Sequence, residues 1–153
     1  MPGKFLIDLT DERFKIPYND GVMTFVRVAN PSAHSDVGSV LLELGKTIPG
    51  AIAYSPSYRS YAYVVLHNAS NHIFAIAFGQ RGLAFRLPES VLPDAVADRG
   101  TLAPDIGPDW VSFNPWDPNA KAAHTDRLRR WCVEALAQAS DGDPSLRSGD
   151  RST

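Results

Sequence analysis

The sequence predicts an α+β domain in which an antiparallel sheet is flanked by two or three helices. Residues 61–87 have the pattern of three short strands joined by two tight turns, and further strand-like stretches precede them. Residues 120–139 instead repeat apolar side chains at helical spacing. We expect residues 1–139 to form a single domain around the meander of residues 61–87, and residues 140–153 to be a flexible polar tail.

Two turns, at residues 68–71 and 79–82, set the strand pairing that we expect within the meander. Pro88 ends the third strand, because proline has no N–H to donate to a neighbouring strand. The predicted cross-strand pairs are Tyr63 with Ile76, Val65 with Phe74, His67 with His72, Ile76 with Phe85, and Phe78 with Leu83.

This pairing gives the meander two unequal faces, because side chains alternate along a strand. The large face carries Tyr61, Tyr63, Val65, His67, His72, Phe74, Ile76, Phe78, Leu83, Phe85 and Leu87. The small face carries Ala62, Val64, Leu66, Ile73, Ala75, Ala77, Ala84 and Arg86. Burial of each large side chain stabilises the fold by about 1.5–3 kcal/mol, so we expect the large face to be shielded from solvent. The helix at residues 120–139 is the best candidate to pack on it. The small face could meet a helix, a second sheet, a partner chain or a ligand.

The chain before the meander is expected to hold strands at residues 14–16, 22–29 and 51–54. Before the last of these we expect a helix that Ser32 or Ser35 caps and whose apolar stripe consists of Val37, Val40, Leu41 and Leu44. Asp20-Gly21 predicts a turn that joins the first two strands as a hairpin. Gly45 is expected to end the helix, because glycine commonly follows the last helical residue.

After the meander we expect a short helix, a loop, a strand and a long helix. The short helix begins either at Pro88, which suits a first helical position, or near Leu92, and it ends before Gly100. Residues 101–109 contain two prolines and a glycine and are predicted to be an ordered surface loop, and residues 110–113 a short strand. The long helix buries a stripe made of Leu128, Trp131, Cys132, Ala135, Leu136 and Ala139.

The charge balance and the single cysteine narrow the classes of function. The formal net charge of −2 gives the whole chain no electrostatic footprint for nucleic acid or an acidic membrane, although a local basic patch stays open. Cys132 is the one cysteine, so no intramolecular disulfide can form, which suits a reducing compartment. The sequence shows neither an apolar run of about 18 residues nor a signal-peptide pattern, so we expect a cytoplasmic protein that does not bind membranes.

His67 and His72 are the candidate metal ligands, because paired cross-strand residues place their Cβ atoms about 4.5–5.5 Å apart. A metal site needs a third and usually a fourth ligand, and no Cys, Asp or Glu is adjacent to either histidine. We therefore expect no metal or other cofactor. The two histidines are expected to be polar side chains at the solvent-exposed end of the first hairpin.

Basic residues form two candidate groups. Arg59, Arg81 and Arg86 surround the meander and could bind an anion, with Arg86 as the lone charge of the small face. The basic run at residues 127–130 could contact phosphates. The alternative for both groups is a solvated or internally paired surface.

Aromatic and acidic residues provide the other candidates. Trp110 and Trp116 could line a pocket or anchor the core and its rim. Asp105, Asp109 and Asp117 could act as acid–base groups or metal ligands, or could form turns beside the neighbouring prolines. The sequence has no P-loop, Gly-x-Ser-x-Gly, zincin or Rossmann pattern.

The order of elements from the meander onward carries a family resemblance. It runs through Ile73-Phe74-Ala75-Ile76, Leu83-Ala84-Phe85-Arg86-Leu87-Pro88-Glu89, a helix, Ala103-Pro104, Trp110-Val111 and a final helix. Over residues 61–139 this order resembles the MmcQ/YjbR family of small α+β proteins. The resemblance implies a CyaY-like sheet flanked by helices and a role in DNA binding, and it departs at residues 14–29, where we expect strands and the family has helices.

These observations favour a non-enzymatic binding domain that acts through its sheet surface on a partner protein, a second copy of itself or DNA. The alternative is a small enzyme or ligand-binding protein, with a pocket between the meander and the loop at residues 101–118. That alternative predicts that at least two of its polar groups, drawn from His67, His72, Arg86 and the loop aspartates, converge around a concavity.

Overall fold

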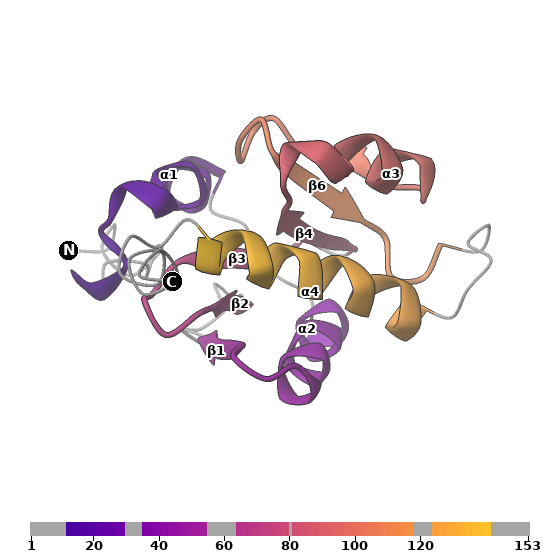
Figure 1. The fold of residues 1–153 in the computed structure, drawn as a ribbon, viewed down its shortest axis with the longest axis horizontal. Coiled ribbons are helices and arrows are strands. Elements are labelled where there is room, and N and C mark those ends of the chain that lie inside the picture. The colour runs from indigo at the N-terminus through magenta and orange to yellow at the C-terminus, as the bar shows by residue number, and fades with distance from the viewer. Residues whose placement is uncertain (1–11, 30–34, 55–63, 80, 118–123, 142–153) are drawn as a thin grey trace, which may run out of the picture.

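The computed structural model describes residues 12–29, 35–54, 64–79, 81–117 and 124–141, and these form an antiparallel six-stranded sheet packed against four helices (Figure 1). The strands are β1 (Ile52–Tyr54), β2 (Val64–His67), β3 (Ile73–Phe78), β4 (Gly82–Arg86), β5 (Thr101–Leu102) and β6 (Trp110–Phe113). They lie in the order β1-β2-β3-β4-β6-β5. The predicted α+β class with an antiparallel sheet is therefore confirmed.

The helices of the described residues are α1 (Asp20–Ala29), α2 (Ser35–Thr47), α3 (Leu92–Ala97) and α4 (His124–Asp141), with short 3₁₀ turns η2 (Glu12–Phe14), η3 (Pro17–Asn19) and η4 (Glu89–Val91). Strands β1 and β6 and helices α3 and α4 lie where the sequence predicts them. Strand β5 pairs with β6 inside the stretch that we expected to be loop. None of the helices in the described ranges has the length and hydropathy of a bilayer-spanning segment.

The predicted hairpin at residues 14–29 is wrong, because this stretch forms η2, η3 and the helix α1. Val22, Phe25 and Val26 are buried at helical spacing, whereas Val28 is 77% exposed. Gly21 belongs to the helix, and a Cβ there would lie 2.4 Å from the carbonyl oxygen of Ile106. The glycine at this position therefore allows close packing of α1 on the loop between β5 and β6.

Helix α2 also continues past its predicted end. Gly45 lies inside it, and a Cβ at this position would approach the Leu66 side chain to 2.8 Å. Gly38, two turns earlier on the same helix, faces Val64 in the same way at 3.3 Å. The two glycines let α2 pack closely on β2, so neither marks a helix end.

The strand register of the meander differs from the predicted one. Val65 pairs with Ile76 and not with Phe74, and the register shifts between Leu66 and His67, so that His67 pairs with Ile73. In the second hairpin Phe78 pairs with Gly82, one residue away from the predicted partner. The connection is therefore a shorter loop, in which Gly79 has a left-handed φ of 61°. Tyr61 and Tyr63 lie outside the described residues.

The one-residue slip between β3 and β4 changes which side chains share a face. Leu83 and Phe85 lie on the same face as Ala75 and Ala77, not with Ile76. The register shift adds Phe74 to this face, because an extra residue in one strand interrupts the alternation. The division into a large and a small face was thus wrong, and both faces mix large and small side chains.

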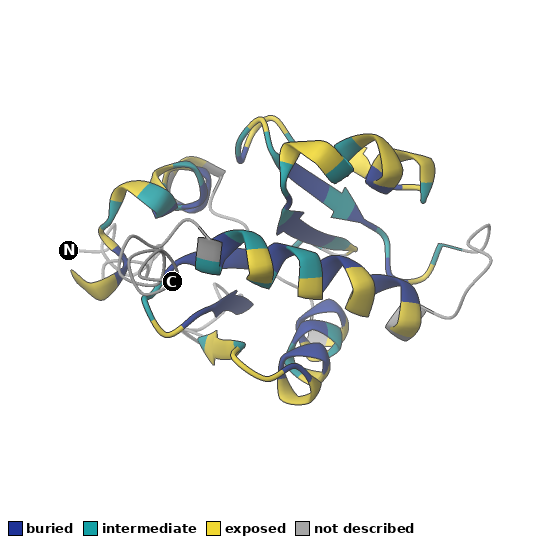
Figure 2. Cartoon of the chain, in the orientation of Figure 1, coloured by how far each residue is buried: buried dark blue, intermediate teal, exposed yellow. Residues whose placement is uncertain are grey.

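Helices α2 and α4 cover the first face of the sheet. Leu128 and Trp131 of α4 pack with Phe74, Leu83 and Phe85, as predicted for the long helix, and Leu41 of α2 joins the same cluster. Figure 1 shows α4 lying across the sheet, and Figure 2 shows that its sheet-facing side and the strands beneath it are buried.

The second face packs on the N-terminal elements. Val65, Ile76 and Ala84 contact a cluster that contains Phe14 of η2, residues Val22, Phe25 and Val26 of α1, and Ile106 and Trp110. Within the described residues, the central strands are therefore covered on both sides by the chain itself.

Candidate functional site

Two of the predicted site residues, His72 and Arg86, meet at the end of the sheet where β3 begins and β4 ends. Both lie over the ring of Tyr18 in η3. The His72 ring is stacked on it with centroids 4.4 Å apart, and the guanidinium carbon of Arg86 is 4.0 Å from the ring centroid. Arg86 donates from Nη1 to the carbonyl oxygen of Tyr18 (2.6 Å) and from Nε to the Asp109 carboxylate (2.8 Å). We name these four residues the Tyr18 cluster.

The polar groups of the Tyr18 cluster are directed into the protein. His72 Nδ1 lies 3.0 Å from the carbonyl oxygen of Ala139, so this nitrogen carries the proton and donates to α4. Burial raises the pKa of Tyr18 to about 12, against the opposing effect of the Arg86 charge, so its hydroxyl stays protonated at neutral pH. The cluster connects η3, the sheet and α4, which is the arrangement of a structural clamp.

Asn19, the neighbour of Tyr18, is fully buried and extends this clamp. Its Nδ2 donates to the carbonyl oxygens of Phe14 and Asn71, each at 2.9 Å. Its Oδ1 accepts from the N–H of Ile73 at 2.8 Å. One buried side chain thus forms three hydrogen bonds to backbone groups of separate segments.

His67 is separate from His72, contrary to the predicted pair. Its Nδ1 donates to the carbonyl oxygen of Asn68 at 2.8 Å, and its Nε2 is buried without a hydrogen-bond partner in the described part of the chain. Burial lowers the pKa of His67, and the nearby Arg13 charge lowers it further, against the effect of the Asn68 hydrogen bond. His67 is therefore a neutral core histidine, and no three His, Cys, Asp or Glu side chains of the described residues gather in a metal-binding geometry.

The predicted arginine cluster around the meander does not assemble within the described residues. Arg81 is exposed just before β4, whereas Arg86 ends the same strand and is held by Asp109. The two guanidinium groups are thus at opposite ends of β4, and Arg59 lies outside the described residues. Trp110, another predicted site residue, is 2% exposed and belongs to the core.

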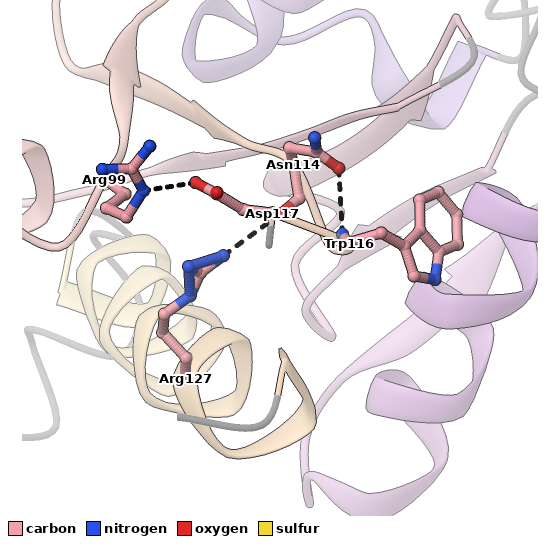
Figure 3. A network of polar contacts seen from close by, with 5 residues as sticks. All are labelled: Arg99, Asn114, Trp116, Asp117 and Arg127. Atoms are coloured by element: carbon pink, nitrogen blue, oxygen red, sulfur yellow. Dashed lines mark hydrogen bonds and ion pairs between the residues drawn. The ribbon is translucent and has the colours of Figure 1, made fainter. Parts of the chain in front are cut away.

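Trp116 lies in a polar network after β6 (Figure 3). The network is at the opposite end of the sheet from the Tyr18 cluster, because Phe113 pairs with Leu83 whereas Arg86 pairs with Trp110. The backbone N–H of Trp116 donates to Asn114 Oδ1, and Arg99 binds the Asp117 carboxylate. The indole of Trp116 is 42% exposed, so it is a surface side chain and not a core anchor.

Arg127 enters the same network from α4 and is only 6% exposed. Its Nη2 donates to the carbonyl oxygen of Asn114 (3.2 Å), and its guanidinium carbon is 5.6 Å from the Phe113 ring centroid. Nε and Nη1 are buried without hydrogen-bond partners in the ranges that the structure covers. Because these two atoms are also inaccessible to solvent, Arg127 cannot form part of an exposed basic stripe.

A groove of about 420 Å³ lies between α2 and α4. Val40 and Leu44 of α2 supply its apolar lining. Its polar lining consists of Ser39, Glu43 and Thr47 of α2 with Asp126 and Arg129 of α4. We name this concavity the α2–α4 groove.

Arg129 joins the two walls of the α2–α4 groove. It donates from Nη1 to Thr47 Oγ1 at 2.6 Å and from Nη2 to the carbonyl oxygen of Thr47 at 3.1 Å. Thr47 Oγ1 in turn donates to the carbonyl oxygen of Leu44. Arg129 therefore satisfies the last carbonyl group of α2, at the helix end where the helix dipole favours cations.

None of the groove residues was singled out from the sequence, except for Arg129 as part of the basic run. Ser39, Glu43 and Asp126 have the spacing and polarity of ordinary helix surfaces, and the sequence holds no signal that α2 and α4 lie side by side. A partial signal was present in Val40 and Leu44, which belong to the apolar stripe of α2 and also line the groove, although Leu44 is largely buried in the core.

Cys132 is not a reactive thiol. It is fully buried in the core between α4 and the sheet, and burial raises its pKa to about 12. The thiol is therefore protonated and shielded at neutral pH.

No family model, curated protein or solved structure matches this chain. The resemblance to the MmcQ/YjbR family therefore stays a prediction.

Proposed function

We propose that this chain is a binding domain rather than a catalyst, and that it binds its ligand in the α2–α4 groove. The groove carries the proposal, because its volume of about 420 Å³ falls in the range that small-molecule sites occupy. It also combines aliphatic walls with a few polar groups, which is the usual composition of such sites. Since the central strands are covered on both faces, the proposal moves the binding surface from the sheet to the helices above it.

The charge distribution favours this proposal over DNA binding. Arg86 is held by Asp109 and Tyr18, and Arg127 is buried, so neither offers its charge to a phosphate backbone. The net charge of −2 also opposes association with nucleic acid.

The alternative, a pocket between the meander and the loop at residues 101–118, has one supporting observation. Arg86 and Asp109 come within hydrogen-bonding distance, as that alternative requires. Arg86 however donates both to the Asp109 carboxylate and to the carbonyl oxygen of Tyr18. This favours a structural role for the two residues over a catalytic one. We further propose a reducing compartment such as the cytoplasm, because the buried Cys132 thiol is free.

The experiment that tests the proposed function is a titration with 1-octanol, a neutral apolar probe, followed by ¹H–¹⁵N NMR. We expect the amide signals of Val40, Leu44 and Arg129 to shift in a saturable manner. Ser39→Trp places an indole in the groove and should abolish the shifts. Val133→Trp is the matched control, because Val133 is 46% exposed on α4 and does not line the groove. Absence of saturable shifts in the unmodified protein, both with octanol and with its charged analogues octylammonium and octanoate, would refute the proposal.

A further inference from the structure

We propose that the ligand of the α2–α4 groove is a small cationic amphiphile, that is, a molecule with an aliphatic body and a protonated amine. This inference rests on the proposed function and adds the chemical class of the ligand. It follows from the charges that line the groove and from the partners that those charges already have.

Asp126 supplies the first negative charge. It lies in the first turn of α4, and its carboxylate has no hydrogen-bond or ion-pair partner among the described residues. Asp126 is exposed and lines the groove, so its carboxylate can receive a cation from there.

Glu43 supplies the second negative charge, from the α2 wall. Its carboxylate contacts Lys46 through one oxygen at 3.4 Å, and both side chains are about 70% exposed. An exposed ion pair of this kind contributes little free energy, so it does not prevent Glu43 from pairing with a ligand.

Arg129 is the cation of the lining, and two of its N–H donors are already engaged within the protein. Two of its guanidinium nitrogens donate to Thr47, at the carboxyl end of α2. An anionic ligand would have to compete for these donors while facing both carboxylates. A cationic ligand would meet Asp126 and Glu43 without disturbing Arg129.

The apolar lining determines the other half of the ligand. Val40 and Leu44 lie between the polar residues, and burying an alkyl chain against them is favourable by the hydrophobic effect. The hydroxyl groups of Ser39 and Thr47 are acceptors that suit the N–H donors of an ammonium group. A chain of several methylene groups ending in an amine satisfies both parts of the groove.

The test compares three probes with the same alkyl chain at pH 7: octylammonium, 1-octanol and octanoate. We expect octylammonium to bind most tightly and octanoate most weakly, by NMR titration of the unmodified protein. Added salt should reduce the preference for octylammonium, because the paired charges are exposed.

Variants of the lining charges identify the source of the preference. Asp126→Asn and Glu43→Gln should each weaken octylammonium binding by roughly two- to fivefold, the range of exposed ion pairs, and leave octanol binding unchanged. Glu89→Gln removes an equal charge from an exposed site outside the groove and should change neither.

The outcomes separate this inference from the proposed function. Equal binding of octylammonium and octanol, or tighter binding of octanoate, would overturn the cationic class while leaving the groove as the binding site. Failure of all three probes to bind would overturn the proposed function itself, and the inference with it.

Discussion

Asn19 shows how much one side chain can hold together in this protein. Its amide connects the carbonyl oxygens of Phe14 and Asn71 and the N–H of Ile73, which belong to η2, the first hairpin turn and β3. Asn71 itself has a left-handed φ of 68°, so its carbonyl is held in an orientation that few residues adopt. Asn19 therefore ties the N-terminal segment to the sheet.

Replacing Asn19 by alanine should destabilise the protein by about 3 kcal/mol, because three hydrogen bonds between a buried amide and the backbone would be lost. Urea unfolding measures this change as a lower transition midpoint. Tyr18→Phe is the matched control in the next residue, because the Tyr18 hydroxyl is buried without a partner in the described residues. Its loss should be neutral or stabilising, and a small effect of Asn19→Ala would show that the amide network contributes little.

His67 should make the stability of the fold depend on pH. Burial lowers its folded-state pKa below the value of about 6.5 that it has in the unfolded chain. Between these two values the unfolded state binds more protons, so stability is complete above pH 6.5 and falls as the pH drops toward the folded-state pKa. The slope in that window is at most about 1.4 kcal/mol per pH unit.

The measurement is the free energy of unfolding at a series of pH values between 7.5 and 5, as an approximate range centred near the histidine pKa. His67→Gln should flatten the curve in this window, and Glu89→Gln, at an exposed site, should leave it unchanged. An unaltered slope in His67→Gln would mean that another group controls the pH dependence.

The sequence identified some of the candidate site residues but not the contacts that they make. His72 and Arg86 were singled out because they are polar residues within an apolar meander. The sequence did not indicate that Tyr18 would bring them together, because Tyr18 lies more than 50 positions from either one. Trp110 was offered as a pocket residue, but the strand that carries it packs on α1, and this follows from tertiary structure alone.

At the scale of single elements, α1 shows why periodicity can mislead. Val22 and Val26 fit both a two-residue repeat and a four-residue repeat, so the stretch satisfies the strand pattern and the helix pattern. Phe25 decides between them, since it is buried with Val22 and Val26 only on a helix. The Asp20-Gly21 dipeptide favoured a hairpin, but its glycine serves close packing against Ile106.

Gly21→Ala should destabilise the fold by about 2 kcal/mol. The new methyl group would overlap the carbonyl oxygen of Ile106, and overpacking of this kind costs about 1–3 kcal/mol. The gain in helix propensity, up to about 1 kcal/mol, offsets only part of this cost. Thermal unfolding provides the measurement.

Val28→Ala is the control for this substitution, because Val28 lies on the same helix and is 77% exposed. Its effect should stay within about 0.5 kcal/mol, as for most surface substitutions. If Gly21→Ala were as stable as the unmodified protein, α1 would not be anchored by its contact with Ile106.

The meander shows the limit of register prediction. Its three strands exist where the pattern places them, because alternating Val, Ile, Phe and Ala residues suit a sheet. The pairing within it depends on loop geometry, and the left-handed Gly79 shortens the second loop by one residue. That single residue reverses the face of β4 relative to β3, so an error in one turn spreads to a whole strand.

At the scale of the molecule, the fold class could be predicted because it depends on the number and order of elements and not on their exact pairing. The apolar stripe of α4, with Leu128 and Trp131, was sufficient to identify the helix that covers the sheet. The α2–α4 groove could not be predicted in the same way, because it arises from how two helices lie beside one another. Such relative placement is set by side-chain packing across the core, for example by Gly38 and Gly45 against β2.

The position of α4 in the chain has a consequence for synthesis on the ribosome. Every strand of the sheet precedes α4, so the face that carries Leu83 and Phe85 is made before the helix that covers much of it. At about 5–20 residues per second, the stretch from Asn114 to Asp141 takes on the order of seconds to translate. During that interval α2 and the short α3 are the partial cover that the nascent sheet has from this side, and apolar strands exposed in this way are natural substrates for chaperones.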